Sequence, residues 1–234
     1  MDFVSSFGVK IPIDRDVISE KLERKLKNNN YEAPEVRGLA NFVKKQDRIL
    51  ELGAGIGFIS TYLSKIFGVK GVLAYEANPD MLPYIEKVHR ANGVENVEVR
   101  NQLLLNDTAV ANASIPFYIT DPLHSSSMVK PDATITRVAD VPTARLSDAI
   151  AEFDPTIIVC DIEGAEAEIF EAVNFGNVKR VYAESHRRKY GGLGMRKFVH
   201  DMHRHDFFLN ARYSADGQVL FNRLPKRQWG QFEG

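Results

Sequence analysis

Residues 49–60 read ILELGAGIGFIS, and this stretch decides the fold class. An apolar run that ends at Leu52 leads into Gly53, Gly55 and Gly57, and a second apolar segment follows. This order predicts a strand, a tight turn and a helix, because glycine permits both the turn and a close approach of the backbone to a ligand. The stretch therefore indicates an α/β fold with a ligand site at its first turn.

The same pattern repeats along the chain. Short runs rich in valine and isoleucine alternate with segments of helical spacing, which is typical of a parallel sheet covered by helices on both faces. Strands are expected at 48–53, 72–77, 95–101, 157–162 and 178–185, and helices near 57–67, 79–92, 165–173 and 193–204. Apolar runs at 207–213 and 218–224 flank Asp216 and Gly217, which indicates a C-terminal antiparallel hairpin. We therefore expect a Rossmann-like α/β fold with a mostly parallel, seven-stranded sheet.

The chain divides into two parts. Residues 1–45 are expected to form an N-terminal extension, with a strand or short hairpin at 3–13 and helices at 14–27 and 34–44. Residues 46–234 are expected to form the Rossmann-like domain, with an irregular insert at about 104–145. An insert of this length is often a lid or a substrate-facing element, and a solvated surface excursion is the alternative.

Composition restricts the class of protein. The 234 residues carry a formal net charge of −1, so the overall charge indicates neither nucleic acid nor an anionic membrane as a partner. Cys160 is the one cysteine, which excludes a disulfide within the chain and a cysteine-based metal site. No apolar run reaches the roughly 20 residues of a membrane span, and the N-terminus lacks the apolar core of a signal peptide. We expect a soluble, cytoplasmic protein.

The glycine loop favours S-adenosylmethionine over a dinucleotide. Phe58 occupies the position where the dinucleotide pattern has its third glycine, and Glu51 lies two residues before the loop. A carboxylate there repels a pyrophosphate but attracts the sulfonium and ammonium groups of S-adenosylmethionine. Glu76, at the end of the second strand, is placed to accept both ribose hydroxyls. Further cofactor contacts are expected from Gly53, Ala54, Gly55, Gly57, Ala77, Asn101, Gln102 and Asp161.

The fourth strand leads into three carboxylates in IIVCDIEGAE, residues 157–166. Ligands of open α/β sheets bind outside the carboxyl ends of the strands, so we expect Asp161 beside the methionine part of the cofactor and the acceptor. Glu163 is expected either to orient the acceptor or to support the turn at Gly164. Glu166 is expected at the start of the next helix, where the helix dipole favours an acid.

His186 follows the fifth strand and is a candidate general base, because imidazole titrates near neutral pH. The expected catalytic residues are thus Asp161, Glu163 and His186. With Glu184 they offer ligands for a hard divalent ion, but no further carboxylate pair has the expected adjacent spacing, so a metal site is an alternative that the sequence does not favour.

Four motifs resemble the FkbM family of S-adenosylmethionine-dependent methyltransferases, which have the class I fold. The motifs are YEAPEVRGL (31–39), ILELGAGIGFIS (49–60), AYEANPDML (74–82) and TARLSDAIAEFDPTIIVCDIEGAEAEIF (143–170). The residues from Asp161 to Glu166 match the family's D-x-E-G-x-E signature in full. The chain departs from the family at Gly55, where the family often has Asn, and at Leu146-Ser-Asp, where it usually has Leu-Asp. The resemblance implies O-methylation of a hydroxyl on a sugar or natural-product small molecule.

Three rival functions remain open. A nucleic-acid methyltransferase, acting on RNA, would use the basic stretch at 186–197, but the near-neutral charge does not favour it. A nicotinamide-dependent oxidoreductase is the second rival, because such enzymes also bind the ribose through an acidic residue in the position of Glu76. A binding protein that has kept the cofactor fold is the third rival. The sequence carries no signal for an oligomeric state.

Overall fold

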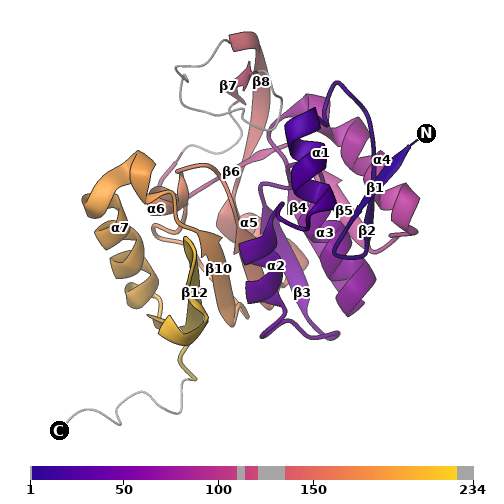
Figure 1. Cartoon of the computed structure of the whole chain (residues 1–234). Helices are drawn as coiled ribbons and strands as arrows, with labels where there is room; N and C mark the ends of the chain where they lie inside the picture. The colour runs from indigo at the N-terminus through magenta and orange to yellow at the C-terminus, as the bar shows by residue number, and fades with distance from the viewer. Residues whose placement is uncertain (1, 110–113, 121–134, 226–234) are drawn as a thin grey trace, which may run out of the picture.

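A seven-stranded sheet forms the centre of the computed structural model, which describes residues 2–109, 114–120 and 135–225 (Figure 1). The strand order is β11-β12-β10-β9-β3-β4-β5. The strands are β3 (Arg48–Leu52), β4 (Gly71–Tyr75), β5 (Val97–Arg100), β9 (Ile157–Cys160), β10 (Arg180–Glu184), β11 (Phe207–Leu209) and β12 (Gln218–Arg223). The first five are parallel, whereas β12 is antiparallel to both β10 and β11. The expected mostly parallel sheet with an antiparallel C-terminal pair is confirmed.

Helices cover both faces of this sheet. The helices are α1 (Glu20–Lys27), α2 (Ala33–Leu39), α3 (Phe58–Tyr62), α4 (Leu82–Asn92), α5 (Leu146–Phe153), α6 (Glu166–Ile169) and α7 (Arg187–Arg204). Successive residues of a strand point to opposite faces, so Ile49 packs with α1 to α4 and Leu50 packs with α5 to α7. The central strands are therefore fixed from both sides, which holds their carboxyl ends in register.

The N-terminal residues join the first of these two cores. β1 (Phe3–Ser6) and β2 (Val9–Pro12) form the expected hairpin, and Ile11 packs with the residues of α4. Helix α1 begins at Glu20, and not at residue 14, because Ser19 caps it by accepting the N–H of Leu22 at 3.2 Å.

Several other elements differ from their expected lengths, among them α2, which ends at Leu39 and not at residue 44. α6 spans four residues where a helix at 165–173 was expected. α7 starts at Arg187, ahead of the expected residue 193, and its backbone breaks at Gly191, which has a φ of 67°. β11 stops at Leu209, and a 3-10 helix at Ala211–Tyr213 replaces the rest of the expected strand.

The insert is more regular than expected in its described part. β6 (Leu103–Leu105), β7 (Ser114–Thr120) and β8 (Ile135–Arg145) form a three-stranded sheet in the order β6-β8-β7, and β7 and β8 project from the body in Figure 1. Phe117, Ile119 and Val141 form a small core of their own. The strand expected at 115–120 is confirmed, because its apolar residues fill this core. The serine-rich segment of the insert lies outside the described residues.

None of the helices in the described ranges is both long enough and apolar enough to span a membrane.

A buried histidine makes the stability of this fold depend on pH. His89 of α4 is 8% exposed, and its Nε2 lies 3.1 Å from the Oγ of Ser60. Burial lowers the pKa of His89 to about 4, below its value of about 6.5 in an unfolded chain. Its contribution to stability is therefore complete above pH 6.5 and is lost as the pH falls toward 4.

We predict that the free energy of unfolding falls more in the wild type than in His89→Gln between pH 7 and pH 4.5, by about 1–3 kcal/mol. Urea titrations of both proteins at the two pH values measure this difference. Carboxylates that titrate in the same range contribute equally to both proteins, so a parallel loss of stability would contradict the prediction.

Candidate active site

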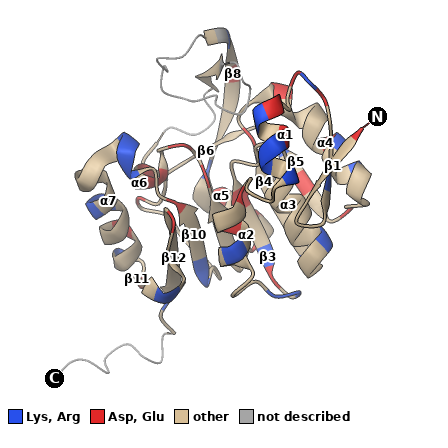
Figure 2. Ribbon diagram, in the orientation of Figure 1, with Lys and Arg blue, Asp and Glu red and all other residues tan. Residues whose placement is uncertain are grey.

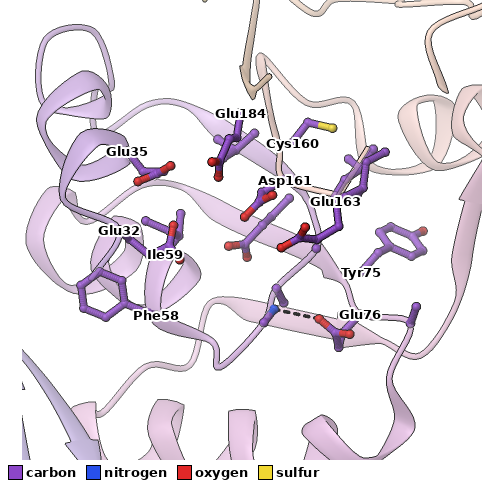
Figure 3. A pocket seen from close by; sticks show the side chains of 18 of the residues that line it. Glu32, Glu35, Phe58, Ile59, Tyr75, Glu76, Cys160, Asp161, Glu163 and Glu184 are labelled. Carbon is purple, nitrogen blue, oxygen red and sulfur yellow. Dashed lines mark hydrogen bonds between the residues drawn. The ribbon is translucent and has the colours of Figure 1, made fainter. Parts of the chain in front are cut away.

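A cavity of about 810 Å³ opens at the carboxyl ends of the parallel strands. Its wall includes Glu51 of β3, Glu76 after β4, Asp161 after β9 and Glu184 at the end of β10. Phe117 of the inserted sheet also lines it. Parallel strands all end at the same edge of a sheet, so four neighbouring strands deliver acidic side chains to one space (Figure 3).

The glycine turn forms the floor of this cavity. The N–H groups of Gly53 and Ala54 donate to the carbonyl oxygen of Tyr75, at 2.9 and 3.1 Å. Gly53 has a φ of 87°, and a Cβ there would lie 1.9 Å from the carbonyl oxygen of Asp161. This position therefore requires glycine, and the turn presents bare backbone to a ligand.

Glu51 is buried beside the glycine turn, and its carboxyl group lacks a full set of hydrogen bonds within the described part of the chain. The residue is 2% exposed, and its Oε2 has no hydrogen-bond partner among the described residues. Burial raises the pKa of Glu51 to about 8. An unpaired buried carboxylate oxygen is costly, and a cationic ligand would offset that cost.

Glu76 links the end of β4 to the glycine turn. Its Oε2 accepts the N–H of Gly55 at 2.7 Å, drawn as the dashed line in Figure 3, and its Oε1 accepts the N–H of Asn78 at 2.8 Å. Burial raises the pKa of Glu76 to about 7. The carboxylate is thus fixed in orientation by two backbone groups and faces the cavity.

The expected cofactor contacts separate into two groups. Ala54, Gly55, Ala77 and Gln102 line the cavity with the residues already described. Asn101 and Gly57 are absent from the wall. Asn101 donates to the carbonyl oxygens of Glu76 and Ala77, and Gly57 precedes α3 and lies against Ile85. Both residues support the loops from behind, so they are placed to act on a ligand indirectly.

The three expected catalytic residues meet at the cavity edge. The Nε2 of His186 lies 3.5 Å from Oε2 of Glu163, 3.7 Å from Oδ1 of Asp161 and 3.9 Å from Oε1 of Glu184. Asp161 directly follows β9, and Glu163 adopts a left-handed backbone with a φ of 58° that carries its side chain toward His186. We call Asp161, Glu163, Glu184 and His186 the edge cluster.

Burial and the charges within the edge cluster shift the pKa values of Asp161 and His186. Burial, reinforced by Glu184 and Glu163, raises the pKa of Asp161 to about 8. Burial alone would lower the pKa of His186, but the carboxylates of Glu166, Asp161 and Glu163 outweigh it and raise this pKa to about 9. The imidazole is therefore protonated at neutral pH in the free protein, and its use as a general base requires that it first lose this proton.

Glu166 begins α6, as expected, and it is also a buried partner of the edge cluster. It is 0% exposed. Its Oε1 accepts the N–H groups of Ile162 and Gly164 at 3.1 and 3.2 Å, and lies 3.0 Å from Nδ1 of His186. Helix α6 is only four residues long, so the hydrogen bonds to the preceding turn and to His186 account for the acid here. Glu166 thereby fixes the ring of His186.

A second acidic wall was not foreseen from the sequence. Glu32 and Glu35, beside and within α2, line the cavity near Glu184, and Figure 3 shows these side chains facing Asp161. Glu35 is 6% exposed and hydrogen-bonds Gln218 of β12. Figure 2 shows the corresponding acidic segments beside α2 and at the end of β10. Both acids belong to the motif YEAPE (31–35), which contributes to the family resemblance, but the motif does not indicate that they lie beside the cavity.

The strand order, the glycine turn and the acids that follow β4 and β9 define a class I methyltransferase that depends on S-adenosylmethionine. The family model described as "Methyltransferase FkbM domain" matches residues 51–214, and the chain belongs to this family. No curated protein matches the sequence.

Solved structures share the fold at low sequence identity. A putative transferase from Pyrococcus horikoshii has a TM-score of 0.51 and 13% identity over 94% of this chain and 71% of its own. TYW2 of M. jannaschii, solved with AdoMet, has a TM-score of 0.50 and 13% identity over 95% and 86%. The ribosomal protein L11 methylase of Lactobacillus delbrueckii subsp. bulgaricus has the same two values over 84% and 81%. At these identities the likeness concerns the fold alone.

The close approach of Gly53 to Asp161 predicts that Gly53→Ala lowers the thermal unfolding temperature and weakens S-adenosylhomocysteine binding at least tenfold. The added methyl group must displace the backbone of Asp161 and so distort both the turn and the edge cluster. Gly68→Ala is the matched control, because Gly68 also has a positive φ, 58°, but a Cβ there meets nothing within 4 Å. Thermal unfolding and calorimetric titration measure both effects, and equal behaviour of the two variants would contradict the prediction.

Proposed function

We propose that this methyltransferase methylates a hydroxyl group of a sugar or natural-product small molecule. The observation that carries the proposal is the edge cluster, which places three carboxylates within 3.9 Å of the Nε2 of His186 at the cavity rim. A hydroxyl is a weak nucleophile until its proton is removed, and this cluster supplies acceptors for that proton.

The cofactor would bind along the glycine turn. The backbone of Gly53 and Gly55 can approach it closely, and the carboxylate of Glu76 would accept hydrogen bonds from the ribose hydroxyls. Glu51 would face the positively charged part, which fits its unpaired buried oxygen. When bound, S-adenosylmethionine supplies an electrophilic methyl group on a sulfonium.

The acceptor would lie between the edge cluster and the second acidic wall. Glu163 and His186 would hold the hydroxyl oxygen, and its proton would pass to the edge cluster, whose groups titrate together and share protons. The apolar wall at Phe117 would exclude water from this side of the cavity. We also propose that residues 1–45 form an extension of the domain at 46–234 that helps to shape this acceptor space.

The proposed reaction is tested by incubating a small-molecule extract with the protein and isotope-labelled S-adenosylmethionine. Mass spectrometry and NMR then identify the atom that carries the label. The proposal expects a labelled O-methyl group on a small molecule, and no product from Asp161→Asn. A label on nitrogen or carbon would contradict the proposal. Labelling of added RNA would instead support the rival nucleic-acid methyltransferase.

A site variant tests the assignment of the ribose. Glu76→Ala should weaken S-adenosylhomocysteine binding about 10–100-fold, because hydrogen bonds to a charged group contribute roughly 1.5–3 kcal/mol. Glu98→Ala is the control, because Glu98 is an exposed acid on the neighbouring strand β5. Isothermal titration calorimetry measures both dissociation constants. An unchanged constant for Glu76→Ala would show that the ribose binds elsewhere.

A further inference from the structure

We infer that Asp161, Glu163 and His186 form a binding site for a divalent cation, with Glu184 as a fourth ligand. This site deepens the proposed function, because the cation would lie where the acceptor hydroxyl reacts. The sequence alone disfavours a metal, since it shows no second adjacent carboxylate pair. The fold supplies the missing neighbours by bringing the ends of β9 and β10 together.

The distances fit ligands that share an ion. One ligand atom from each of the three residues lies within 4.8 Å of the others. The Nε2 of His186 is 3.5–3.9 Å from three carboxylate oxygens, which is too long for hydrogen bonds. Two ligands at about 2.1 Å from a metal ion are roughly 3–4 Å apart, depending on the coordination angle. The edge cluster therefore has the spacing of a coordination shell.

The surroundings of His186 match those of a metal-binding histidine. Such histidines commonly direct the second ring nitrogen at a carboxylate, which fixes the ring and its tautomer. The Oε1 of Glu166 lies 3.0 Å from Nδ1 of His186, and Glu166 is 0% exposed. Nε2 is thus left to face the cavity and the three carboxylates.

The charge of the cavity also calls for a cation. The Oδ1 of Asp161 is buried, has no hydrogen-bond partner among the described residues, and points at Nε2 of His186. Lys189 pairs with Glu163 but is half exposed, and no ion pair among the described residues joins Asp161 or Glu184 to a lysine or arginine. A bound ion would take the place of the proton on His186 as the counter-charge of these carboxylates, while S-adenosylmethionine would lie nearer Glu51 and Glu76.

The ligand types select the class of ion. Three carboxylates with one imidazole suit Mn²⁺ or Fe²⁺ better than Ca²⁺, which takes oxygen ligands alone. Cys160, the last residue of β9, is 1% exposed, packs in the core with α5 to α7, and is not one of the side chains that converge on this site. A substrate hydroxyl that coordinated the ion would lose its proton more readily, as water does on a bound metal.

Mn²⁺ binding to the full chain tests this site without any acceptor. Electron paramagnetic resonance of free Mn²⁺ during a titration should show about one bound ion per chain. Asp161→Asn should weaken binding at least tenfold, and Glu166→Gln about 10–100-fold through loss of the bond that orients His186. Circular dichroism checks that both variants are folded.

Glu35→Gln is the matched control, because Glu35 lines the same cavity but lies outside the edge cluster. Its affinity for Mn²⁺ should match that of the wild type. An equal loss in Asp161→Asn and Glu35→Gln would overturn the site in favour of diffuse attraction, and so would the absence of saturable binding. Lys189→Met should tighten binding, because it removes a competing cation from Glu163.

The two proposals fail separately. Absent Mn²⁺ binding together with a labelled O-methyl product would remove the metal site and leave the proposed function. Saturable Mn²⁺ binding together with a labelled nitrogen would keep the site and remove the proposed hydroxyl acceptor.

Discussion

Buried carboxylates at the carboxyl edge of the sheet are the constraint on which the rest of the structure depends. Glu51 and Glu76 sit where water is largely excluded, Asp161 is partly buried beside them, and burial raises the pKa of each. A buried charge is stable only when it is paired or bonded. The fold keeps these acids together at a cost in stability, and a positively charged ligand is the partner that offsets it.

The surrounding framework explains how the acids are held there. Ile158 and Cys160 of β9 pack on one face of the sheet and Ile157 and Val159 on the other, so the strand is anchored up to the residue before Asp161. The glycine turn then allows the backbone of Asp161 to lie against Gly53. The packing of β9 and the geometry of the site are therefore coupled, because a shift of the strand also moves the carbonyl group of Asp161 that lies against Gly53.

Part of this architecture could be predicted because it depends on local sequence. The run from Ile49 to Gly57 specifies strand, turn and helix, and the run ending at Cys160 delivers Asp161 to the sheet edge. Glu51 and Glu76 could be assigned to the cavity because each adjoins a predicted strand end. The C-terminal antiparallel pair followed from Asp216 and Gly217 between two apolar runs.

The remaining features depend on long-range contacts that local patterns do not contain. Glu166 resembles any acid at a helix start, and only the position of His186, twenty residues later, shows it to be a buried acceptor. Glu35 enters the cavity because α2 packs beside β12. The proposed cation site could not be predicted from residues adjacent in sequence, because its ligands follow two strands, β9 and β10, that pair in space.

Proton release on cofactor binding, measured by calorimetry at pH 7 in buffers of different ionisation enthalpy, tests the central claim most directly. Glu51, with a pKa of about 8, is largely protonated before binding, and a nearby cation favours its ionised form. The account predicts net release of protons with S-adenosylmethionine, a smaller release with uncharged-sulfur S-adenosylhomocysteine, and a decline of both toward pH 9. No release at pH 7, or proton uptake, would contradict it.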